Sequence, residues 1–113
     1  LLSGDLERAR EPILLRAWEC EPGATVAALA HHGSRGAGSG VWWARVRPLL
    51  AVISVGAGNP YHLPHPATLD AAVLHGSQLR RTDRDGAIRC AFGAGWILVR
   101  AERPPCPQGP PML

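Results

Sequence analysis

Short apolar runs alternate with segments of helical periodicity along this chain. Residues 25–30 and 49–55 are mostly apolar and of strand length, the pattern of strands that are buried on both faces. Residues 6–18 instead space their apolar positions roughly as a helix does, and residues 41–46 and 66–75 are also expected to be helical. The alternation predicts a layered α/β fold, with residues 49–55 as its central strand.

The expected helix ends carry recognisable signals. Ser39 is a suitable N-cap for the segment 41–46. Pro66 suits the first position of the next helix, and Gly76 suits its end. Pro12 lies inside the segment 6–18 and predicts a kink or two shorter helices.

Towards the C-terminus the pattern predicts β structure and then a tail. The sequence Asp83-Arg84-Asp85-Gly86 separates two strand-like segments, 78–82 and 87–92, and predicts a hairpin turn between them. Residues 96–100 are expected to add a further strand. Residues 104–113 are rich in proline, which cannot pair inside a sheet, so we expect a disordered tail after a domain formed by residues 1–103.

Composition narrows the class of protein. A length of 113 residues allows one core, and 46% apolar with 19% charged residues is ordinary for a globular domain. The longest apolar run has seven residues, whereas a membrane-spanning helix needs about twenty, so this chain is not expected to be transmembrane. The net charge of +3, from arginines scattered along the chain, permits an anionic substrate without requiring one.

The cysteines do not indicate a metal site or a disulfide framework. Cys20, Cys90 and Cys106 are odd in number and far apart, and none has the C-x-x-C spacing. They are expected to be small core residues or bystanders.

Histidine and aspartate side chains follow the expected strands. Asp5 follows what looks like the end of a buried strand at the N-terminus, the pair His31-His32 follows the strand 25–30, and the loop with His62 and His65 follows the strand 49–55. The carboxyl ends of such strands meet at one edge of a sheet. Carboxylate oxygen and imidazole nitrogen are ligands that suit zinc and manganese. The alternative is an ordinary loop in which one histidine caps a backbone group and Gly33 makes the turn.

Other polar and aromatic residues have simpler interpretations. His75 is expected at a helix C-terminus, near the last carbonyl groups. Asp83 and Asp85 lack the further acidic ligands of a calcium loop. Trp42, Trp43 and Tyr61 are able to stack on nucleic-acid bases, but packing inside the protein is the expectation for such aromatics.

Several motifs in order resemble the ComEC branch of the metallo-β-lactamase superfamily, over residues 1–91. They are Leu1-Leu2-Ser3-Gly4-Asp5, Ala28-Leu29-Ala30-His31-His32-Gly33-Ser34-Arg35, the segment 50–56, Asn59-Pro60-Tyr61 with Pro64-His65-Pro66, and the segment 81–89. The resemblance implies the C-terminal half of an αββα sandwich, with residues 1–103 as a partial domain.

The resemblance also implies a site and its chemistry. Asp5, His31 and His32 would be catalytic and would hold one or two divalent metal ions, Zn or Mn, in the complete domain. Ser34, Tyr61 and His65 would contact the substrate. The implied activity is phosphodiester hydrolysis during DNA uptake in natural transformation, with DNA and the membrane channel portion of the full protein as partners. The implied location is the cell envelope, in a soluble domain on the extracytoplasmic side of the inner membrane.

Two departures from the family pattern leave alternatives open. The main metal motif of the superfamily, His-x-His-x-Asp-His, would precede Asp5 and is not in this chain. The frequent His-Pro-His-Pro sequence is Leu63-Pro64-His65-Pro66 here, with His62 one position earlier. The chain is therefore either a fragment of a metal-dependent hydrolase or a non-catalytic truncated remnant or interaction module. A third alternative is a small basic nucleic-acid-binding protein without metal.

Overall fold

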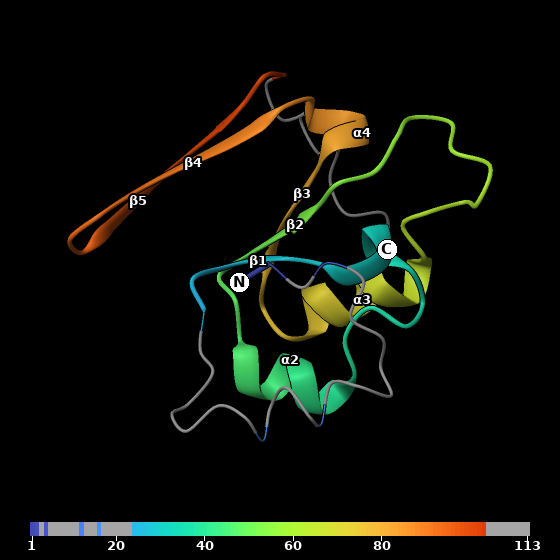
Figure 1. Ribbon diagram of the computed structural model, residues 1–113, viewed down its shortest axis with the longest axis horizontal. Coiled ribbons are helices and arrows are strands. Elements are labelled where there is room, and N and C mark those ends of the chain that lie inside the picture. Colours follow the sequence, from blue (N-terminus) through green and yellow to red (C-terminus); the bar gives the residue numbers. More distant parts are fainter. Residues whose placement is uncertain (3, 5–11, 13–15, 17–23, 104–113) are drawn as a thin grey trace, which may run out of the picture.

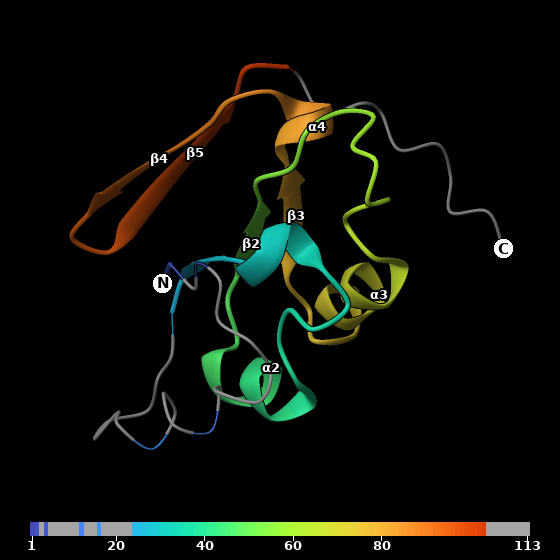
Figure 2. The same cartoon turned by 45° about the vertical axis from the view of Figure 1, so that its right-hand side comes forward.

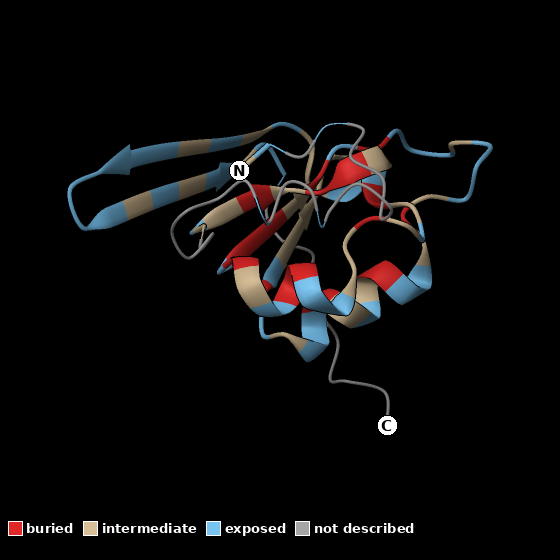
Figure 3. Cartoon of the chain, turned by 60° about the horizontal axis from the view of Figure 1, so that its bottom comes forward, coloured by how far each residue is buried: buried red, intermediate tan, exposed pale blue. Residues whose placement is uncertain are grey.

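A computed structural model describes residues 1, 2, 4, 12, 16 and 24–103. A parallel sheet with strand order β1-β2-β3 forms its centre, helices α2 and α3 lie below the sheet in Figure 3, and a hairpin of β4 and β5 projects from the sheet (Figures 1 and 3). The elements in chain order are β1 Val26–Ala28, the 3₁₀ helix η2 Ala30–Gly33, α2 Gly40–Val46, β2 Leu50–Ile53, α3 Pro66–Leu74, β3 Gln78–Arg81, α4 Thr82–Asp85, β4 Ile88–Gly93 and β5 Trp96–Ala101.

The sheet has β2 at its centre, as the apolar run predicted. Val26 of β1 is paired with Leu50 of β2, and Leu50 is also paired with Gln78 of β3, all in parallel. The N-terminal residues extend this sheet at the free edge of β1, where Leu2 forms a parallel bridge with Ala28. Parallel strands need crossover connections, and here α2 and α3 provide them.

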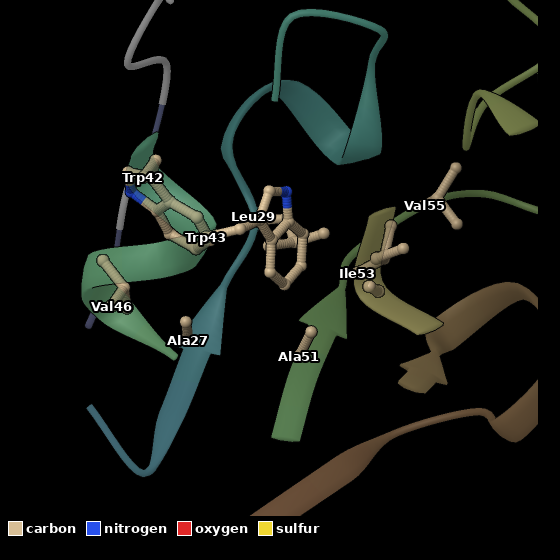
Figure 4. Close-up of a cluster of buried hydrophobic side chains, with 9 residues drawn as sticks. Ala27, Leu29, Trp42, Trp43, Val46, Ala51, Ile53 and Val55 are labelled. Atoms are coloured by element: carbon tan, nitrogen blue, oxygen red, sulfur yellow. The ribbon is translucent and has the colours of Figure 1, made fainter. Parts of the chain in front are cut away.

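The core lies between one face of the sheet and the two helices. Alternate residues of β1 and β2 point to this face and are buried with Trp42 and Trp43 of α2 (Figure 4). The two indole rings meet edge to face, with their centroids 4.9 Å apart at an angle of 83°. Packing is therefore confirmed for this tryptophan pair. The imidazole of His75, at the end of α3, stacks on Trp43 with a centroid distance of 6.0 Å.

The helix signals read from the sequence are confirmed. The Ser39 side chain accepts a hydrogen bond of 3.2 Å from the Trp42 N–H, which caps α2. Pro66 is the first residue of α3, and His75 follows its last turn, where the His75 N–H donates to the carbonyl of Ala71. Gly76 comes next, with a φ of 77° that favours glycine.

The hairpin predicted at residues 83–86 is wrong. This segment belongs to the short helix α4, and the antiparallel hairpin is formed by β4 and β5, where Gly93 pairs with Trp96 around a two-residue loop. The reason is local capping, because the Asp85 carboxylate accepts the Arg81 N–H at 2.8 Å and stabilises a helical turn. The sequence Asp-x-Asp-Gly suits both structures, and the parallel pairing of β3 with β2 leaves no antiparallel partner for β3 among the described residues.

Several other expectations concern residues that the structure does not describe. Asp5, Cys20, Cys106, the tail 104–113 and most of the helix expected over residues 6–18 lie outside them. No helix in the described part of the chain has the length and apolar character needed to cross a membrane. The mixture of helices and strands is confirmed, while the half-sandwich of the metallo-β-lactamase fold stays a prediction.

Burial in the core predicts which apolar residues carry stability. Ile53 is fully buried in β2, whereas Val73 of α3 is 69% exposed. Ile53→Ala is expected to lower the free energy of unfolding by about 2–5 kcal/mol. Val73→Ala removes a smaller, exposed side chain and should stay within about 0.5 kcal/mol of the parent chain. Urea denaturation of the two variants measures both values, and equal losses would contradict this description of the core.

The ion pair between Arg81 and Asp83 predicts a pH dependence. The Arg81 guanidinium donates to both carboxylate oxygens, at 2.6 and 3.0 Å, and this hydrogen bonding lowers the pKa of Asp83 below its ordinary value of 3.8, although partial burial raises it. A folded-state pKa below the unfolded one gives stability that is present above pH 3.8 and is lost as the pH falls through the folded-state value.

Asp83→Asn should therefore reduce stability at neutral pH and flatten the loss of stability in acid. Urea denaturation at a series of pH values tests this. Asp70→Asn, which removes an exposed carboxylate from α3, is the control. An acid dependence that is the same in the Asp83 variant and the parent chain would exclude the ion pair as its cause.

Candidate functional site

The His-His-Gly-Ser segment forms η2 and the residue after it, directly beyond the carboxyl end of β1 (Figure 2). Its backbone holds two other parts of the chain. The His31 N–H donates to the carbonyl of Gly4 at 3.0 Å, and the Gly33 carbonyl accepts the His65 N–H at 2.9 Å. The segment before Asp5 and the loop before α3 therefore meet at this turn, as the edge-of-sheet argument predicted.

A hydrogen bond from α3 also reaches this turn. The Thr68 hydroxyl, buried in the first turns of the helix, donates to the Ser34 carbonyl at 2.7 Å. The N–H of Ser34 donates in turn to the His31 carbonyl at 3.0 Å. Ser34 is thus held from both sides through its backbone.

The backbone of the turn is strained. His31 has φ 47° and ψ 41°, and His32 has φ 53° and ψ 33°, which is the left-handed region. Residues with a Cβ atom pay about 1–2 kcal/mol each to adopt this conformation. Such strain persists only where the surroundings enforce it, and it is concentrated at functional sites. The left-handed pair therefore shows a turn that the surrounding contacts hold in place, as the backbone of Arg47 is held at the end of α2.

The imidazole of His32 has a defined tautomer. Its Nδ1 lies 2.7 Å from the backbone carbonyl oxygen of Ser54, beyond the end of β2. A carbonyl oxygen only accepts hydrogen bonds, so Nδ1 carries the proton and donates it. A neutral ring then has its lone pair on Nε2, and the side chain is exposed. This is how a metal-ligating histidine is commonly held, with one ring nitrogen fixed by a carbonyl and the other available.

His65 has the opposite tautomer. Its Nδ1 accepts the N–H of Ala67 at 3.1 Å and caps α3, so the proton of the neutral ring is on Nε2. His65 is therefore the N-cap of α3. In this state Nε2 is a hydrogen-bond donor, which is the polarity needed to contact an anionic oxygen.

Asn59 organises the loop between β2 and α3. Its side-chain amide donates to the carbonyls of Gly56 and Leu63, at 3.1 and 2.7 Å, and its Oδ1 accepts the Leu63 N–H at 2.9 Å. Tyr61, on the same loop, is 78% exposed. Sequence reasoning missed this role of Asn59, although an Asn-Pro pair is a known turn signal.

Thr82 is a second residue that sequence reasoning missed. Its hydroxyl accepts the Val55 N–H and donates to the Val55 carbonyl, both at 2.8 Å. The residue after β3 thereby fixes the chain just beyond Ser54, whose carbonyl holds His32. No feature of the sequence marks a threonine for this contact, because it depends on the parallel register of β2 and β3.

The described residues do not form a complete metal site. Within residues 1, 2, 4, 12, 16 and 24–103, no three His, Cys, Asp or Glu side chains are grouped closely enough to hold an ion. His32 fits a metal through its free Nε2 lone pair, and Asp5 lies outside the described residues. A metal ion bound to His32 would need further ligands from outside the described residues.

The chain is similar in sequence to three characterised proteins. Identity is 38% over 103 residues with "Competence protein ComA" of Neisseria gonorrhoeae, 34% over 92 residues with "ComE operon protein 3" of Bacillus subtilis (strain 168), and 33% over 103 residues with "Recombination protein 2" of Haemophilus influenzae. These matches cover 91%, 81% and 91% of this chain and make the three proteins its homologues.

The same matches cover only a small part of each relative. The chain spans 15%, 12% and 13% of the length of these proteins, in the order given. No family model matches the chain. No solved structure matches it.

The close packing at Gly33 predicts a sensitive position. Gly33 has a φ of 75°, and a Cβ there would lie 2.8 Å from Cβ of Pro64 and 3.1 Å from a methyl group of Ile53. Gly33→Ala should lower the free energy of unfolding by about 1–3 kcal/mol, from overpacking and left-handed strain.

Gly56→Ala is the matched control, because nothing lies within 4 Å of its added Cβ and its φ is not in the left-handed region. Urea denaturation compares the two variants. If Gly33→Ala is as stable as Gly56→Ala, the turn is not packed as described.

Proposed function

We propose that this chain acts in DNA uptake during natural transformation, where it supplies one side of a divalent-metal site that hydrolyses a phosphodiester. The observation that carries the chemical part is the hydrogen bond between His32 Nδ1 and the Ser54 carbonyl. This hydrogen bond leaves Nε2 of an exposed histidine available as a metal ligand. The histidine lies at the edge of the sheet where the other candidate residues come after the ends of strands.

The names of the homologues support the biological part. One is named a competence protein, one is encoded in the ComE operon, and one is named a recombination protein. Since the chain spans a small share of each, activity, substrate and partners are proposals for the complete protein. We place that protein in the cell envelope, with this part on the extracytoplasmic side beside the membrane channel portion.

Among the candidate ligands, His32 is the histidine that holds the metal, together with the carboxylate of Asp5. The chemistry of these donors, imidazole nitrogen and carboxylate oxygen, suits Zn or Mn. A divalent cation supplies Lewis-acid activation of water and of the phosphodiester. One or two ions are expected in the complete protein.

His31 has a different role because adjacent side chains rarely serve the same ion. Its backbone N–H binds the carbonyl of Gly4, the residue before Asp5, and so holds the aspartate segment beside the turn. We assign its imidazole to the substrate side of the site rather than to the metal. Ser34, anchored through its backbone, is assigned to the same side.

His65 and Tyr61 contact the substrate in this proposal. The Nε2–H of His65 donates to a phosphate oxygen while its Nδ1 continues to cap α3. Tyr61 is exposed on the loop braced by Asn59 and is available to a bound strand. Both residues bind and orient a substrate without taking part in proton transfer.

The different roles of the two adjacent histidines give a direct test in the full-length gene product. His32→Ala should remove bound metal, measured by inductively coupled plasma mass spectrometry, and should abolish hydrolysis of DNA. His31→Ala should retain the metal and lose mainly rate, by about 10–100-fold.

His75→Ala removes an imidazole at the far end of α3 and should retain both metal and activity. The isolated 113-residue chain, which lacks the His-x-His-x-Asp-His motif, should bind Zn or Mn weakly and show no nuclease activity. Equal, negligible effects of the His31 and His32 substitutions on metal content would refute the proposed ligand.

A further inference from the structure

The hairpin of β4 and β5 stands apart from the rest of the fold. Its strands pair only with each other in the described part of the chain, and it extends away from the parallel sheet (Figures 1 and 2). Most of its side chains are exposed or half-buried (Figure 3). An isolated two-stranded hairpin is marginally stable in water, so contact with a further surface would stabilise a projecting hairpin of this length.

Although arginines occur along the whole sequence, the positive net charge is concentrated in residues 80–103. Residues 80–103 contain six arginines and three carboxylates, whereas residues 1–79 contain six of each. The whole formal charge of +3 therefore belongs to β3, α4 and the hairpin. Two of these arginines, Arg89 and Arg100, are on the projecting hairpin, where their positive charge favours an anionic partner.

Two of these arginines face each other across the hairpin. Arg89 of β4 and Arg100 of β5 are direct cross-strand partners, and both are exposed. Like charges in such positions destabilise a strand pair. Neither guanidinium forms an ion pair with a carboxylate within the described ranges, and the neighbouring Glu102 accepts the N–H of Ala87. An anion bound between the two guanidinium groups would relieve their repulsion.

An aromatic ring lies on the same face of the hairpin. Side chains alternate along a strand, so the register places Trp96, opposite Gly93, on the face of Arg89 and Arg100. The indole lies against Gly93, where an added Cβ would overlap the ring. Trp96 is nevertheless 57% exposed, so its outer surface is open to a flat ligand.

We propose that this face of the hairpin, which we call the Arg89–Arg100 face, binds a single strand of nucleic acid. The two guanidinium groups bind backbone phosphates, and an unpaired base stacks on Trp96. The base must be unpaired because an indole has access to a base face only outside a duplex. The inference rests on the proposed function for the kind of nucleic acid, DNA, but its residues are separate from the metal site.

Oligothymidylate binding tests the arginines in the 113-residue chain. Fluorescence anisotropy is measured in EDTA, so that metal-site chemistry does not contribute. Arg89→Gln/Arg100→Gln should weaken binding by about tenfold and reduce the slope of log affinity against log salt by about 1.4, since each phosphate contact on a single strand contributes about 0.7.

Arg16→Gln/Arg47→Gln is the matched control, because it removes the same charge from two exposed arginines outside the hairpin. It should change affinity less than about twofold. EDTA removes divalent metal from every sample, so a failed metal-site proposal does not alter this result. If both double variants lose the same affinity, or if the parent chain does not bind oligothymidylate, the proposal is overturned.

Trp96→Ala separates stacking from charge. It should weaken oligothymidylate binding by about fivefold or more, whereas binding of inorganic polyphosphate, which has no bases, should not change. Trp96→Phe should restore most of the lost affinity. Binding to anionic phospholipid vesicles in place of oligothymidylate would assign the face to a membrane and overturn the proposal.

A measurement in the full-length gene product does not depend on folding of the isolated chain. Photocrosslinking to a DNA strand that carries bromodeoxyuridine, followed by tryptic digestion, should label the peptide 90–100, which trypsin releases by cleavage after Arg89 and Arg100. Crosslinks found only in other peptides would exclude Trp96 as the stacking residue.

Discussion

The contact at Gly33 is the constraint on which the candidate site depends. Its Cα lies so close to Pro64 and Ile53 that a single methyl group would collide with both, and its carbonyl accepts the N–H of His65. The turn after β1, the core of β2 and the loop before α3 are therefore packed at one point. The two histidines before Gly33 have left-handed backbone conformations, and the backbone of His31 is hydrogen-bonded to Gly4 and Ser34.

Two histidines near this point have opposite hydrogen-bonding roles. The ring of His32 donates from Nδ1 to a carbonyl, and the ring of His65 accepts at Nδ1 from an N–H. The first arrangement exposes a lone pair and the second exposes a proton. A site that binds both a cation and an anionic oxygen needs a nitrogen lone pair and an N–H donor. Hydrogen bonds to the backbone give these two roles to two residues of the same type.

The apolar core and most of the excess positive charge lie in different parts of the chain. Trp42, Trp43 and alternate strand residues form a core under one face of the parallel sheet. In the sequence, residues 1–79 carry no net charge. The excess arginines belong to β3, α4 and the hairpin that projects from that sheet. On the hairpin, Arg89 and Arg100 are cross-strand partners, and both side chains are exposed.

The sequence by itself determined the elements whose signals are local. Apolar runs identified β1 and β2, and Ser39 and Pro66 marked the starts of α2 and α3, because capping and periodicity act within a few residues. The prediction of a hairpin turn at residues 83–86 was wrong because Asp-x-Asp-Gly suits a helical turn equally well. The tautomers of the histidines and the Thr82 contact were decided only by the tertiary structure, since they depend on which distant carbonyl or N–H faces each side chain after the strands have paired.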